Sequence, residues 1–428
     1  MTVSIKQQRI AYLAENAPDM AMDLSHHIDL DWMKEACRLT RKDGAVGVDG
    51  ETFKEFEQGL DARLKSLIDH AKEGTYRAPP VRRVQIPKGD GTLRPIGIPT
   101  IEDKVLQRAT VMALEAVYEQ DFLDCSYGFR PGRSPHDALG SLWEGLMKMG
   151  GGHVIHLDIQ SFFDEVDHKL LQEIFSKRVR DGVLRRLLGK WLRAGVVDSG
   201  QPKRVRSGVP QGGVISPLLS NIYLHEVLDK WFAEQVRPCM QSHAFMVRYA
   251  DDAILVFANQ RDAERVFEVL PKRFARFGLA LHPKKTRAID FRRGVHNTSF
   301  EFLGFTHVWG KSRHKKSVIR RRTARKRLSL GLRNMNKWLR KVRHKSISEQ
   351  HRELCQKLRG HFQYYGLTGN GKLLSAFLFW TVRLWRKWLG RRAYKAKRTW
   401  DWFNGVLRRF PLPRPSPVHS VFRHVANP

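Results

Sequence analysis

The chain has 428 residues, of which 42% are hydrophobic, and it carries 76 Lys and Arg against 43 Asp and Glu, a formal net charge of +33 at pH 7. A chain of this length buries a large core and divides into two or three domains. Its four cysteines are far apart and form no Cys-x-x-Cys pair, which argues against a zinc site and against a disulfide framework.

The apolar segments predict neither secretion nor a membrane span. Residues 1–20 lack the apolar run of a signal peptide. The most apolar late run, residues 373–382, stops at Arg383 and is too short to cross a bilayer. We therefore expect a cytoplasmic protein with no membrane partner.

The first three quarters of the chain are typical of a mixed α/β body. Residues 153–166 begin as an apolar strand and continue into a helical stretch. Residues 207–232 form a loop rich in Pro and Gly and then an amphipathic helix. Residues 245–257 place two apolar arms around a polar centre, which predicts a β-hairpin. Residues 262–286 indicate a helix, a short strand and a basic loop.

Two adjacent aspartates, Asp251 and Asp252, occupy the predicted hairpin turn. Two like charges on a turn raise each other's pKa unless a cation is bound between them, although Asp is also an ordinary turn residue. A third carboxylate, Asp158, stands at the end of the apolar strand "VIHL". Three carboxylates at strand ends of one sheet can gather two divalent ions, about 3.5–4 Å apart, for in-line phosphoryl transfer. Hard Mg²⁺ suits such oxygen ligands.

Positive charge is concentrated at the C-terminal end. Residues 311–428 hold 32 Lys and Arg and only three acidic residues, whereas residues 1–310 hold 44 and 40. A composition boundary therefore falls near Gly310. Self-repulsion on this scale disfavours a compact state without counter-charge, so we expect this segment to bind nucleic acid. Six of the eleven tryptophans also lie here, most of them at spacings typical of a helical core. The Pro-rich stretch 408–420 is expected to be extended.

The order of the motifs resembles a group II intron-encoded reverse transcriptase and maturase. The motifs are "GAVGVDGETFKEF", "PKGDGTLRPIGIPTIEDKVLQ", "YGFRPGRSPHDAL", "HLDIQSFFDEV", "GVPQGGVISPLLSNIYL", "RYADD", "LALHPKKT", "FEFLGF" and "LRGHFQYYG". Paired cysteines of the zinc-stabilised endonuclease domain that many relatives carry do not follow, so the resemblance is to the endonuclease-lacking, group IIC-like bacterial lineage. The stretch "HFQYY" departs from the family, which more often has Asn before the two tyrosines.

The resemblance implies roles for individual residues. Asp158, Asp251 and Asp252 match the catalytic, metal-binding carboxylates, with the Ile159 carbonyl as a further ligand to two Mg²⁺ ions, for which Mn²⁺ is a substitute. The nucleotide-binding positions are Lys88 and Arg94 for the triphosphate, Phe163 as a steric gate beneath the sugar, and Gln211 near the sugar and base. Lys284 and Lys285 are weaker candidates for backbone contacts.

The basic run "RRRTARKR" is the candidate RNA-binding site, namely Arg320, Arg321, Arg322, Arg325, Lys326 and Arg327. Its alternative interpretation is a solvated helix face or an arm packed on the body. The expected partners are a structured intron RNA, an RNA template with a DNA or RNA primer, dNTPs and a DNA target.

The fold implied is an α/β right-hand polymerase, with fingers and palm around an antiparallel sheet, followed by an α-helical, strongly basic thumb/maturase domain. The expected domains are 1–80 (N-terminal extension and fingers), 81–308 (reverse transcriptase fingers-palm) and 309–428 (thumb/maturase, domain X). The implied function is RNA-directed DNA synthesis by two-metal nucleotidyl transfer, with binding of group II intron RNA to assist splicing and retromobility.

Three alternatives stay open. A host-recruited relative acting in DNA repair or phage defence would use the same site. A splicing cofactor with an inactive polymerase is disfavoured by the intact Asp triad. An RNA-templated RNA polymerase is disfavoured by Phe163.

Overall fold

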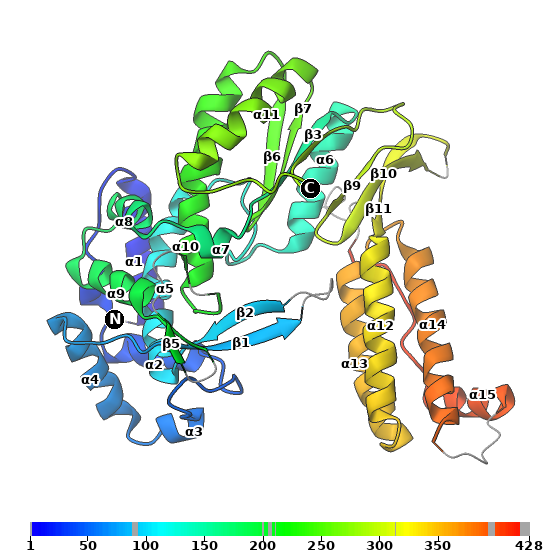
Figure 1. Ribbon diagram of the computed structural model, residues 1–428, viewed down its shortest axis with the longest axis horizontal. Coiled ribbons are helices and arrows are strands. Elements are labelled where there is room, and N and C mark those ends of the chain that lie inside the picture. The colour runs from blue at the N-terminus through cyan, green and yellow to red at the C-terminus, as the bar shows by residue number, and fades with distance from the viewer. Residues whose placement is uncertain are drawn as a thin grey trace. The chain divides into compact units, whose positions relative to one another are not determined.

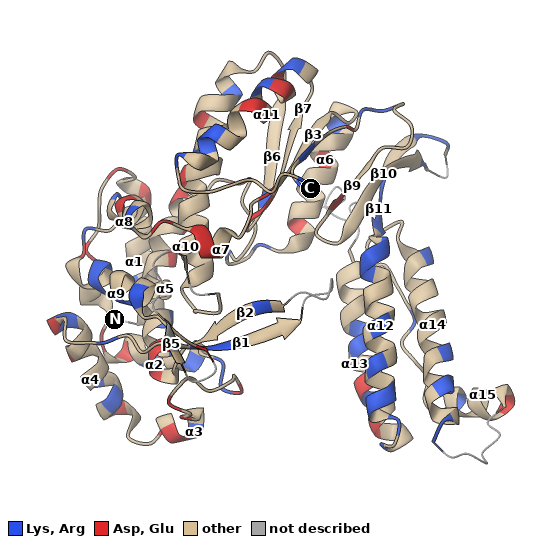
Figure 2. Cartoon of the chain, viewed as in Figure 1, with Lys and Arg blue, Asp and Glu red and all other residues tan. Residues whose placement is uncertain are grey.

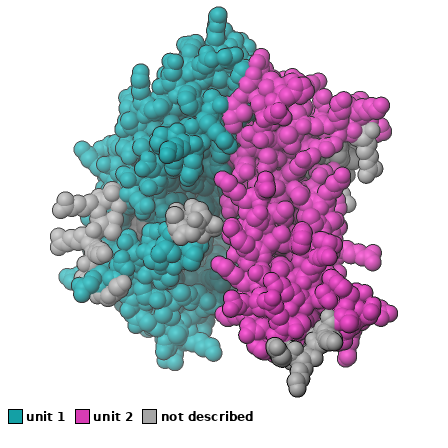
Figure 3. Space-filling view, turned by 45° about the vertical axis from the view of Figure 1, so that its right-hand side comes forward, with its two compact units in different colours: residues 1–138, 153–288 teal, residues 139–152, 289–428 magenta. Residues whose placement is uncertain are grey.

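The computed structural model describes residues 2–87, 93–198, 201–203, 208–209, 211–312, 314–392 and 399–419. The chain forms two compact units, coloured separately in Figure 3. Unit 1 comprises Met1–Ala138 and His153–Ala288, and unit 2 comprises Leu139–Gly152 and Ile289–Pro428. Helix α6 (Pro135–Met149) therefore begins in unit 1 and ends in unit 2.

The helices of the first part of unit 1 gather around the long helix α5 (Ile101–Asp121), which is buried on most of its sides. Helices α1, α2 and α3 contact α5 (Figure 1), and the Trp32 indole donates to the Ala109 carbonyl at 2.9 Å. The helices of unit 1 other than α5, α6 and the α10 region are α1 (Val3–Asn16), η1 (Ser25–His27), α2 (Leu30–Leu39), α3 (Phe53–Phe56), α4 (Leu60–Glu73), α7 (Phe162–Glu165), α8 (His168–Ser176), α9 (Gly182–Arg193) and α11 (Gln260–Ala275).

A first sheet of unit 1 has the strand order β2-β1-β4-β5. Strands β1 (Val81–Pro87) and β2 (Leu93–Ile98) are antiparallel, and β1 pairs in parallel with β4 (Val196–Asp198). Strand β5 (Gln201–Lys203) completes the sheet beside β4. The β1–β2 ribbon carries Arg94, one of the expected nucleotide-binding residues.

The second sheet has the order β6-β7-β3-β8 and carries the aspartates. Its strands are β3 (His153–Asp158), β6 (Ala244–Tyr249), β7 (Asp252–Phe257) and β8 (Arg287–Asp290). Strands β3 and β7 are antiparallel neighbours and buried along most of their length. Helix α11 packs on both strands, which are accordingly largely apolar. Each has a carboxylate at one end: Asp158 is the last residue of β3 and Asp252 the first residue of β7.

Unit 2 combines a small sheet with a helical bundle. Strands β9 (Ser299–Phe302), β10 (Phe305–Lys311) and β11 (Ser317–Thr323) form an antiparallel sheet in the order β11-β10-β9. The helices that follow are α12 (Arg325–Val342), α13 (Ile347–Tyr365), α14 (Gly371–Gly390) and α15 (Trp400–Arg409). Their shared core includes Leu339, Leu354, Leu358, Trp385 and Phe403. Figure 2 shows Lys and Arg crowded along α12, α13 and α14.

The side-chain amide of Gln350 caps the C-terminal end of helix α12. The Gln350 amide donates to the carbonyls of Val342, Arg343 and Lys345 at 2.9–3.2 Å, where α12 ends. Its own carbonyl accepts from the Trp385 indole at 3.0 Å. The carbonyls that a helix end leaves unpaired are therefore satisfied by a buried neutral side chain.

Several sequence expectations are confirmed. The predicted hairpin is β6–β7, with Asp251 and Asp252 at its turn, and residues 153–166 form β3 and then α7. Of the stretch 408–420, expected to be extended, Arg408 and Arg409 instead end helix α15, and residues 411–418 contain neither helix nor strand. In the part of the chain that the structure describes, no helix is long and apolar enough to cross a membrane.

Other expectations differ from the structure. The helix expected at the end of 207–232 is more buried than an amphipathic helix in its first part, α10 (Ser216–Leu224). It continues through the π-helical turns His225–Asp229 and Trp231–Val236 to the 3₁₀ turn Arg237–Cys239, where Glu226, Lys230 and Glu234 keep exposed surface. The short strand expected after α11 is reduced to one isolated bridge at Leu281. The composition boundary at Gly310 falls within β10, because the small sheet packs as part of unit 2 although its first strands are not basic.

Candidate active site

The three aspartates meet at one end of the β6-β7-β3 sheet. Asp158 is the last residue of β3, and Asp252 is the first residue of β7. The antiparallel register pairs these two residues directly. Asp251 lies beside them in the turn between β6 and β7. Residues almost a hundred positions apart in sequence thus become neighbours because the register of two buried strands is fixed by their side chains.

A buried arginine holds the turn that carries Asp251. The fully buried Arg248 guanidinium donates to the Asp229 carboxylate at 2.7 and 2.5 Å. It also donates to Asn221 Oδ1 and to the carbonyl of Ala250, both at 3.0 Å. Ala250 has a φ of 57°, a left-handed conformation that is uncommon for a residue with a side chain. The guanidinium therefore fixes a strained turn immediately before Asp251.

The segment 125–128 supports the hairpin from the side. The Arg248 N–H donates to the Cys125 carbonyl at 2.7 Å, and the Tyr127 N–H donates to the Arg248 carbonyl at 2.9 Å. At Gly128, a Cβ atom would lie 2.4 Å from the backbone nitrogen of Ala250. Only glycine permits this approach, which gives the motif "YGFRPG" a structural role beside the aspartates.

The electrostatics of the site reflect the crowding of negative charge. Desolvation, together with the negative charges of Asp252 and Asp158, raises the pKa of Asp251, and Arg94 acts in the opposite direction. Lys285 Nζ lies 3.4 Å from both carboxylate oxygens of Asp158. His156 Nε2 lies 2.9 Å from Asp252 Oδ1. The Lys285 ammonium thus offsets part of the repulsion, and the His156 ring supplies a hydrogen-bond partner to Asp252.

The donor set fits a hard divalent cation, since it consists of carboxylate oxygens at neighbouring strand ends. Among the described residues, however, no three His, Cys, Asp or Glu side chains converge closely enough to hold an ion. Asp158 faces Lys285 and Asp252 faces His156 instead.

The Ile159 carbonyl is the further ligand expected from the sequence. Ile159 is 6% exposed and forms an isolated bridge with Leu281. The two hydrogen bonds across this bridge join Gln160 N–H to the Ala280 carbonyl and His282 N–H to the Asp158 carbonyl, both at 2.8 Å. Neither of these two bonds uses the Ile159 carbonyl.

Two of the expected nucleotide-binding residues contact each other. Arg94 Nε donates to Gln211 Oε1 at 2.9 Å. The Gly97 N–H donates to the Gln211 carbonyl at 2.6 Å, and at Gly212, with a φ of +112°, a Cβ atom would lie 2.3 Å from the Gly97 carbonyl oxygen. The glycine of "PQGG" thus lets this loop approach strand β2. Lys88 lies outside the described residues.

Phe163 lies at the start of α7 and is half-buried, whereas its neighbour Phe162 is 3% exposed and belongs to the core. The two rings meet edge to face with centroids 5.4 Å apart. The Val209 N–H donates to the Phe163 carbonyl at 2.7 Å. Phe162 is thus a core aromatic, and Phe163 keeps an accessible edge.

The basic run falls on two elements of unit 2. Arg320, Arg321 and Arg322 lie in β11, and Arg325, Lys326 and Arg327 open α12. Arg322, Arg325, Lys326 and Arg327 are exposed, and Arg320 is half-buried and donates to the Lys311 carbonyl.

The position of Arg321 differs from its predicted role as an RNA-binding residue. It is 3% exposed, donates to the Leu139 carbonyl at 3.1 Å and lies over the Trp143 ring. Burial lowers the pKa of its guanidinium to about 10. Successive side chains of a strand point to opposite faces, so one residue of three consecutive arginines turns inward and its guanidinium is unavailable to RNA.

Sequence reasoning missed His156 and Arg248 as residues of the site. His156 lies two positions before Asp158, on the same face of its strand, and this spacing is a usable signal. Arg248 lies inside the motif "RYADD", but its partners Ser126, Asn221 and Asp229 are distant in sequence, so no local pattern identifies its burial.

The comparisons with known proteins agree with this geometry. Residues 86–307 match the family model described as "Reverse transcriptase (RNA-dependent DNA polymerase)". The chain is 37% identical to Protein YkfC of Escherichia coli K12 over 289 residues, which are 60% of this chain and 76% of YkfC. It is 42% identical to the group II intron-encoded protein LtrA of Lactococcus lactis over 173 residues, 40% of this chain and 28% of LtrA. It is also 34% identical to the putative COX1/OXI3 intron 2 protein of Saccharomyces cerevisiae over 169 residues, 39% of this chain and 19% of that protein.

Proposed function

Because the chain belongs to the family of reverse transcriptases (RNA-dependent DNA polymerases) and is related to group II intron-encoded proteins, we propose that it copies RNA into DNA at Asp158, Asp251 and Asp252 and binds group II intron RNA to assist splicing and retromobility. The observation that carries the catalytic part is the strand register that pairs Asp158 with Asp252, beside Asp251. A reverse transcriptase domain implies a right-hand polymerase fold, and the mixed helix and antiparallel-sheet architecture agrees with it.

The residues proposed to hold two Mg²⁺ ions, or Mn²⁺ in their place, are the three aspartates and the Ile159 carbonyl. When bound, such ions supply charge stabilisation to an in-line phosphoryl transfer. The protein supplies the rest. Arg248 fixes the turn before Asp251, Lys285 offsets part of the negative charge of the site, and His156 forms a hydrogen bond with Asp252.

For the incoming nucleotide, Arg94 is the proposed contact to the triphosphate, oriented by its hydrogen bond to Gln211. A guanidinium meets phosphate oxygens with charge-assisted hydrogen bonds. Lys88 is proposed to join it. The accessible edge of Phe163 is the proposed gate that a 2′-hydroxyl would collide with, so dNTPs are preferred to rNTPs.

For RNA binding, unit 2 supplies the charge. The exposed residues Arg322, Arg325, Lys326 and Arg327 are the proposed contacts to the phosphates of the intron RNA, with Arg320 beside them. Neutralised phosphates release counterions and so drive association. The template with its DNA or RNA primer, and a DNA target, are the other proposed partners.

Primer extension and RNA recovery test the two parts of the proposal. The purified protein should extend a primer on an RNA template with dNTPs and Mg²⁺, and EDTA should abolish extension. RNA that copurifies with the protein should be enriched in a group II intron. Absence of extension with either Mg²⁺ or Mn²⁺ would contradict the polymerase assignment. Recovery of unrelated RNA alone would contradict the intron assignment and favour a role in host DNA repair or phage defence.

A further inference from the structure

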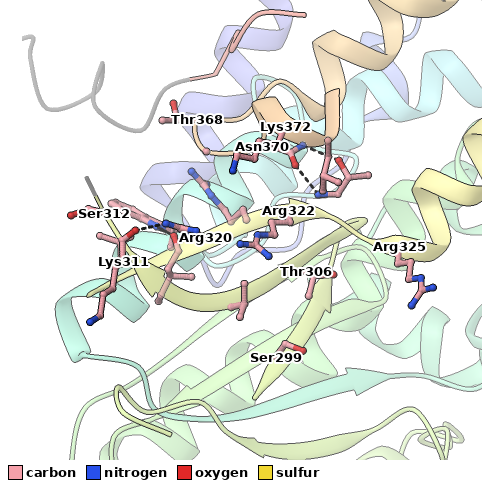
Figure 4. Close-up of a pocket in the computed structure, with 18 of the residues that line it drawn as sticks. Ser299, Thr306, Lys311, Ser312, Arg320, Arg322, Arg325, Thr368, Asn370 and Lys372 are labelled. Atoms are coloured by element: carbon pink, nitrogen blue, oxygen red, sulfur yellow. Dashed lines mark hydrogen bonds between the residues drawn. The ribbon is translucent and has the colours of Figure 1, made fainter. Parts of the chain in front are cut away.

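Unit 2 contains a cavity of about 1110 Å³ that the proposed polymerase chemistry does not use. One wall is formed by strands β10 and β11, and the other by the segment from Thr368 to Leu373 that leads into α14 (Figure 4). This volume exceeds the range of about 300–1,000 Å³ of small-molecule sites. The cavity therefore has room for more than one group of the size of a nucleotide base.

The cavity runs along β11, which is the edge strand of its sheet. Side chains cover this edge at two points. At one, the Trp143 indole donates to the Ile319 carbonyl at 2.9 Å, and the Ile319 N–H donates to Met147 Sδ at 3.4 Å. At the other, the Thr323 N–H donates to Asn370 Oδ1 at 3.0 Å.

Arg321 lies midway between these two covered points. The backbone groups of a strand return to the same side every second residue, so the Arg321 N–H and C=O face the edge as those of Ile319 and Thr323 do. Among the described residues, nothing bonds to them on that side, and Arg321 lines the cavity. The cavity wall thus presents one hydrogen-bond donor beside one acceptor.

The positive charge of the residues that line the cavity favours an anionic ligand. Its described lining residues include four arginines and two lysines and no acidic residue. Arg322 and Arg325 are exposed, and no described hydrogen bond or carboxylate engages their guanidinium groups. Figure 4 shows Arg320 and Arg322 on β11 facing the same space as Thr306. An unpaired cationic rim of this kind is complementary to phosphate.

The rest of the lining is uncharged. Val308, Val318, Leu328 and Leu373 supply apolar contact, and the side chains of Ser299, Thr306, Ser312 and Thr368 supply hydroxyls. A flat apolar group with a polar edge, joined to a phosphate and a sugar hydroxyl, matches such a lining. Unpaired bases of RNA are recognised in this way, by apolar contact together with hydrogen bonds to their exposed edges.

We propose that this cavity binds one or two unpaired nucleotides of a single-stranded RNA segment, with a base edge on the Arg321 backbone and phosphates at Arg322 and Arg325. The proposal rests on the proposed binding of RNA by unit 2 and names the part of the RNA that is read there. A duplex does not enter, because its bases are stacked and paired.

A filling substitution tests the cavity without changing charge. Val318 lines the cavity, whereas its neighbour Ser317 is exposed and does not. With the full-length protein, Val318→Phe should weaken binding of a fluorescent single-stranded RNA of eight nucleotides at least tenfold by anisotropy. It should leave the affinity for a blunt RNA duplex within about twofold. Ser317→Phe, on the opposite face of β11, should change neither affinity.

A second pair of variants, placed on helix α14, distinguishes filling of the cavity from misfolding of the sheet. Leu373→Phe narrows the cavity from α14, and Ser375→Phe, exposed on the same helix, is its control. The same loss for single-stranded RNA alone is expected from Leu373→Phe. If the filled variants lose affinity for single-stranded DNA of the same sequence as much as for the RNA, the assignment to RNA is overturned. If Val318→Phe and Leu373→Phe both bind the single-stranded RNA with unchanged affinity, the cavity is not the binding site. Failure of the wild-type protein to bind either RNA would instead contradict the proposed function.

Discussion

The two units treat buried charge in different ways. Unit 1 buries arginines against carboxylates: Arg248 bonds Asp229, Arg178 bonds Asp121 and Arg130 bonds Glu119. In unit 2, buried polar groups are bonded to neutral partners at two places: the Gln350 amide on the end of α12 and the Asn370 amide on Thr323. Its one strongly buried arginine in β11, Arg321, donates to a carbonyl instead of a carboxylate.

This difference follows from composition and has functional consequences. With only three acidic residues in 311–428, this part of unit 2 has few carboxylates to pair with buried cations, and its ion pair between Lys345 and Glu353 lies at the surface. Unit 1 has the acids to fix arginines in place and so to hold a turn in one geometry. The catalysis proposed for unit 1 would depend on orientation, whereas the RNA binding proposed for unit 2 would depend on summed charge and shape.

The largest expected effect is the loss of a buried ion pair in unit 1. Arg248→Met leaves the Asp229 carboxylate buried and unpaired, which should cost about 3–5 kcal/mol of unfolding free energy. Arg321→Met in unit 2 removes an arginine without a bonded carboxylate and should cost less than about 1 kcal/mol. Urea unfolding followed by circular dichroism measures both. Equal losses would show that the two arginines are not held differently.

The second effect separates catalysis from RNA binding. Asp251→Ala should reduce primer extension by about 10²–10³-fold or more, as loss of preorganised charge stabilisation does, while splicing of the cognate intron persists. Asp69→Ala, which removes an exposed charge from helix α4, is the control and should retain activity. Residual extension above about a hundredth of wild type would remove Asp251 from the catalytic set.

The third effect concerns pH and unit 2. Burial lowers the pKa of His361 to about 4 from 6.5, and its ring stacks on Phe377. The unfolded chain therefore takes up a proton more readily, and stability is lost as the pH falls from about 6.5 toward 4. The loss at pH 5 should be about 2 kcal/mol.

His361→Phe keeps the stacking and should remove this dependence between pH 7 and pH 5. His344→Phe, at an exposed position, is the control and should leave the dependence in place. Thermal melts of the three proteins at both values provide the measurement. An unchanged pH dependence in His361→Phe would assign it to another group.

The fourth effect concerns the sugar of the incoming nucleotide. Phe163→Val should increase the use of rNTPs relative to dNTPs about tenfold or more, because relief of a steric clash of this kind is worth about 1–3 kcal/mol. Phe162→Val, in the core, should lower stability and leave the preference unchanged. Single-nucleotide incorporation with each triphosphate measures it, and a constant ratio in Phe163→Val would place the gate elsewhere.

The smallest effect concerns the salt dependence of RNA binding. Replacing Arg322, Arg325 and Lys326 by Gln should flatten the slope of log affinity against log salt by roughly two units, at about 0.7–0.9 per lost phosphate contact. Extension on a short annealed template should change little. The double variant Arg352→Gln and Arg359→Gln, at exposed positions on α13, is the control with which the salt slope of the triple variant is compared. A filter-binding titration that gives the wild-type slope would remove the run from the RNA-binding surface.

The local elements of the site could be predicted from the sequence because hairpin and strand signals depend on neighbouring residues. The apolar arms of residues 245–257 and the strand ending at Asp158 gave both halves of the carboxylate site. The pairing of Asp158 with Asp252 is a matter of strand register between distant segments, and for that pairing the family motifs, not periodicity, were informative.

The features that were missed depend on tertiary contacts. Arg321 appears as one more cation in a basic run, and only the strand geometry shows that it turns inward. The helix at the end of 207–232 has an amphipathic pattern in the sequence, yet neighbours bury almost all of its first part, α10. Membership of residues 139–152 in unit 2 has no signal in composition at all.

The divided helix α6 has a consequence for the order of events during synthesis. Leu139, Leu142 and Leu146 on this helix are fully buried, and Leu139 and Trp143 meet Arg321 and Ile319, which lie more than 170 positions later in the chain. At roughly 5–20 residues per second, the ribosome needs on the order of 10–35 seconds to deliver the partners of this helix. During that interval the apolar face of α6 lacks these partners and is exposed to solvent. We therefore expect chaperones to bind the nascent chain, and we expect the yield of folded protein to depend on the speed of translation between α6 and β11.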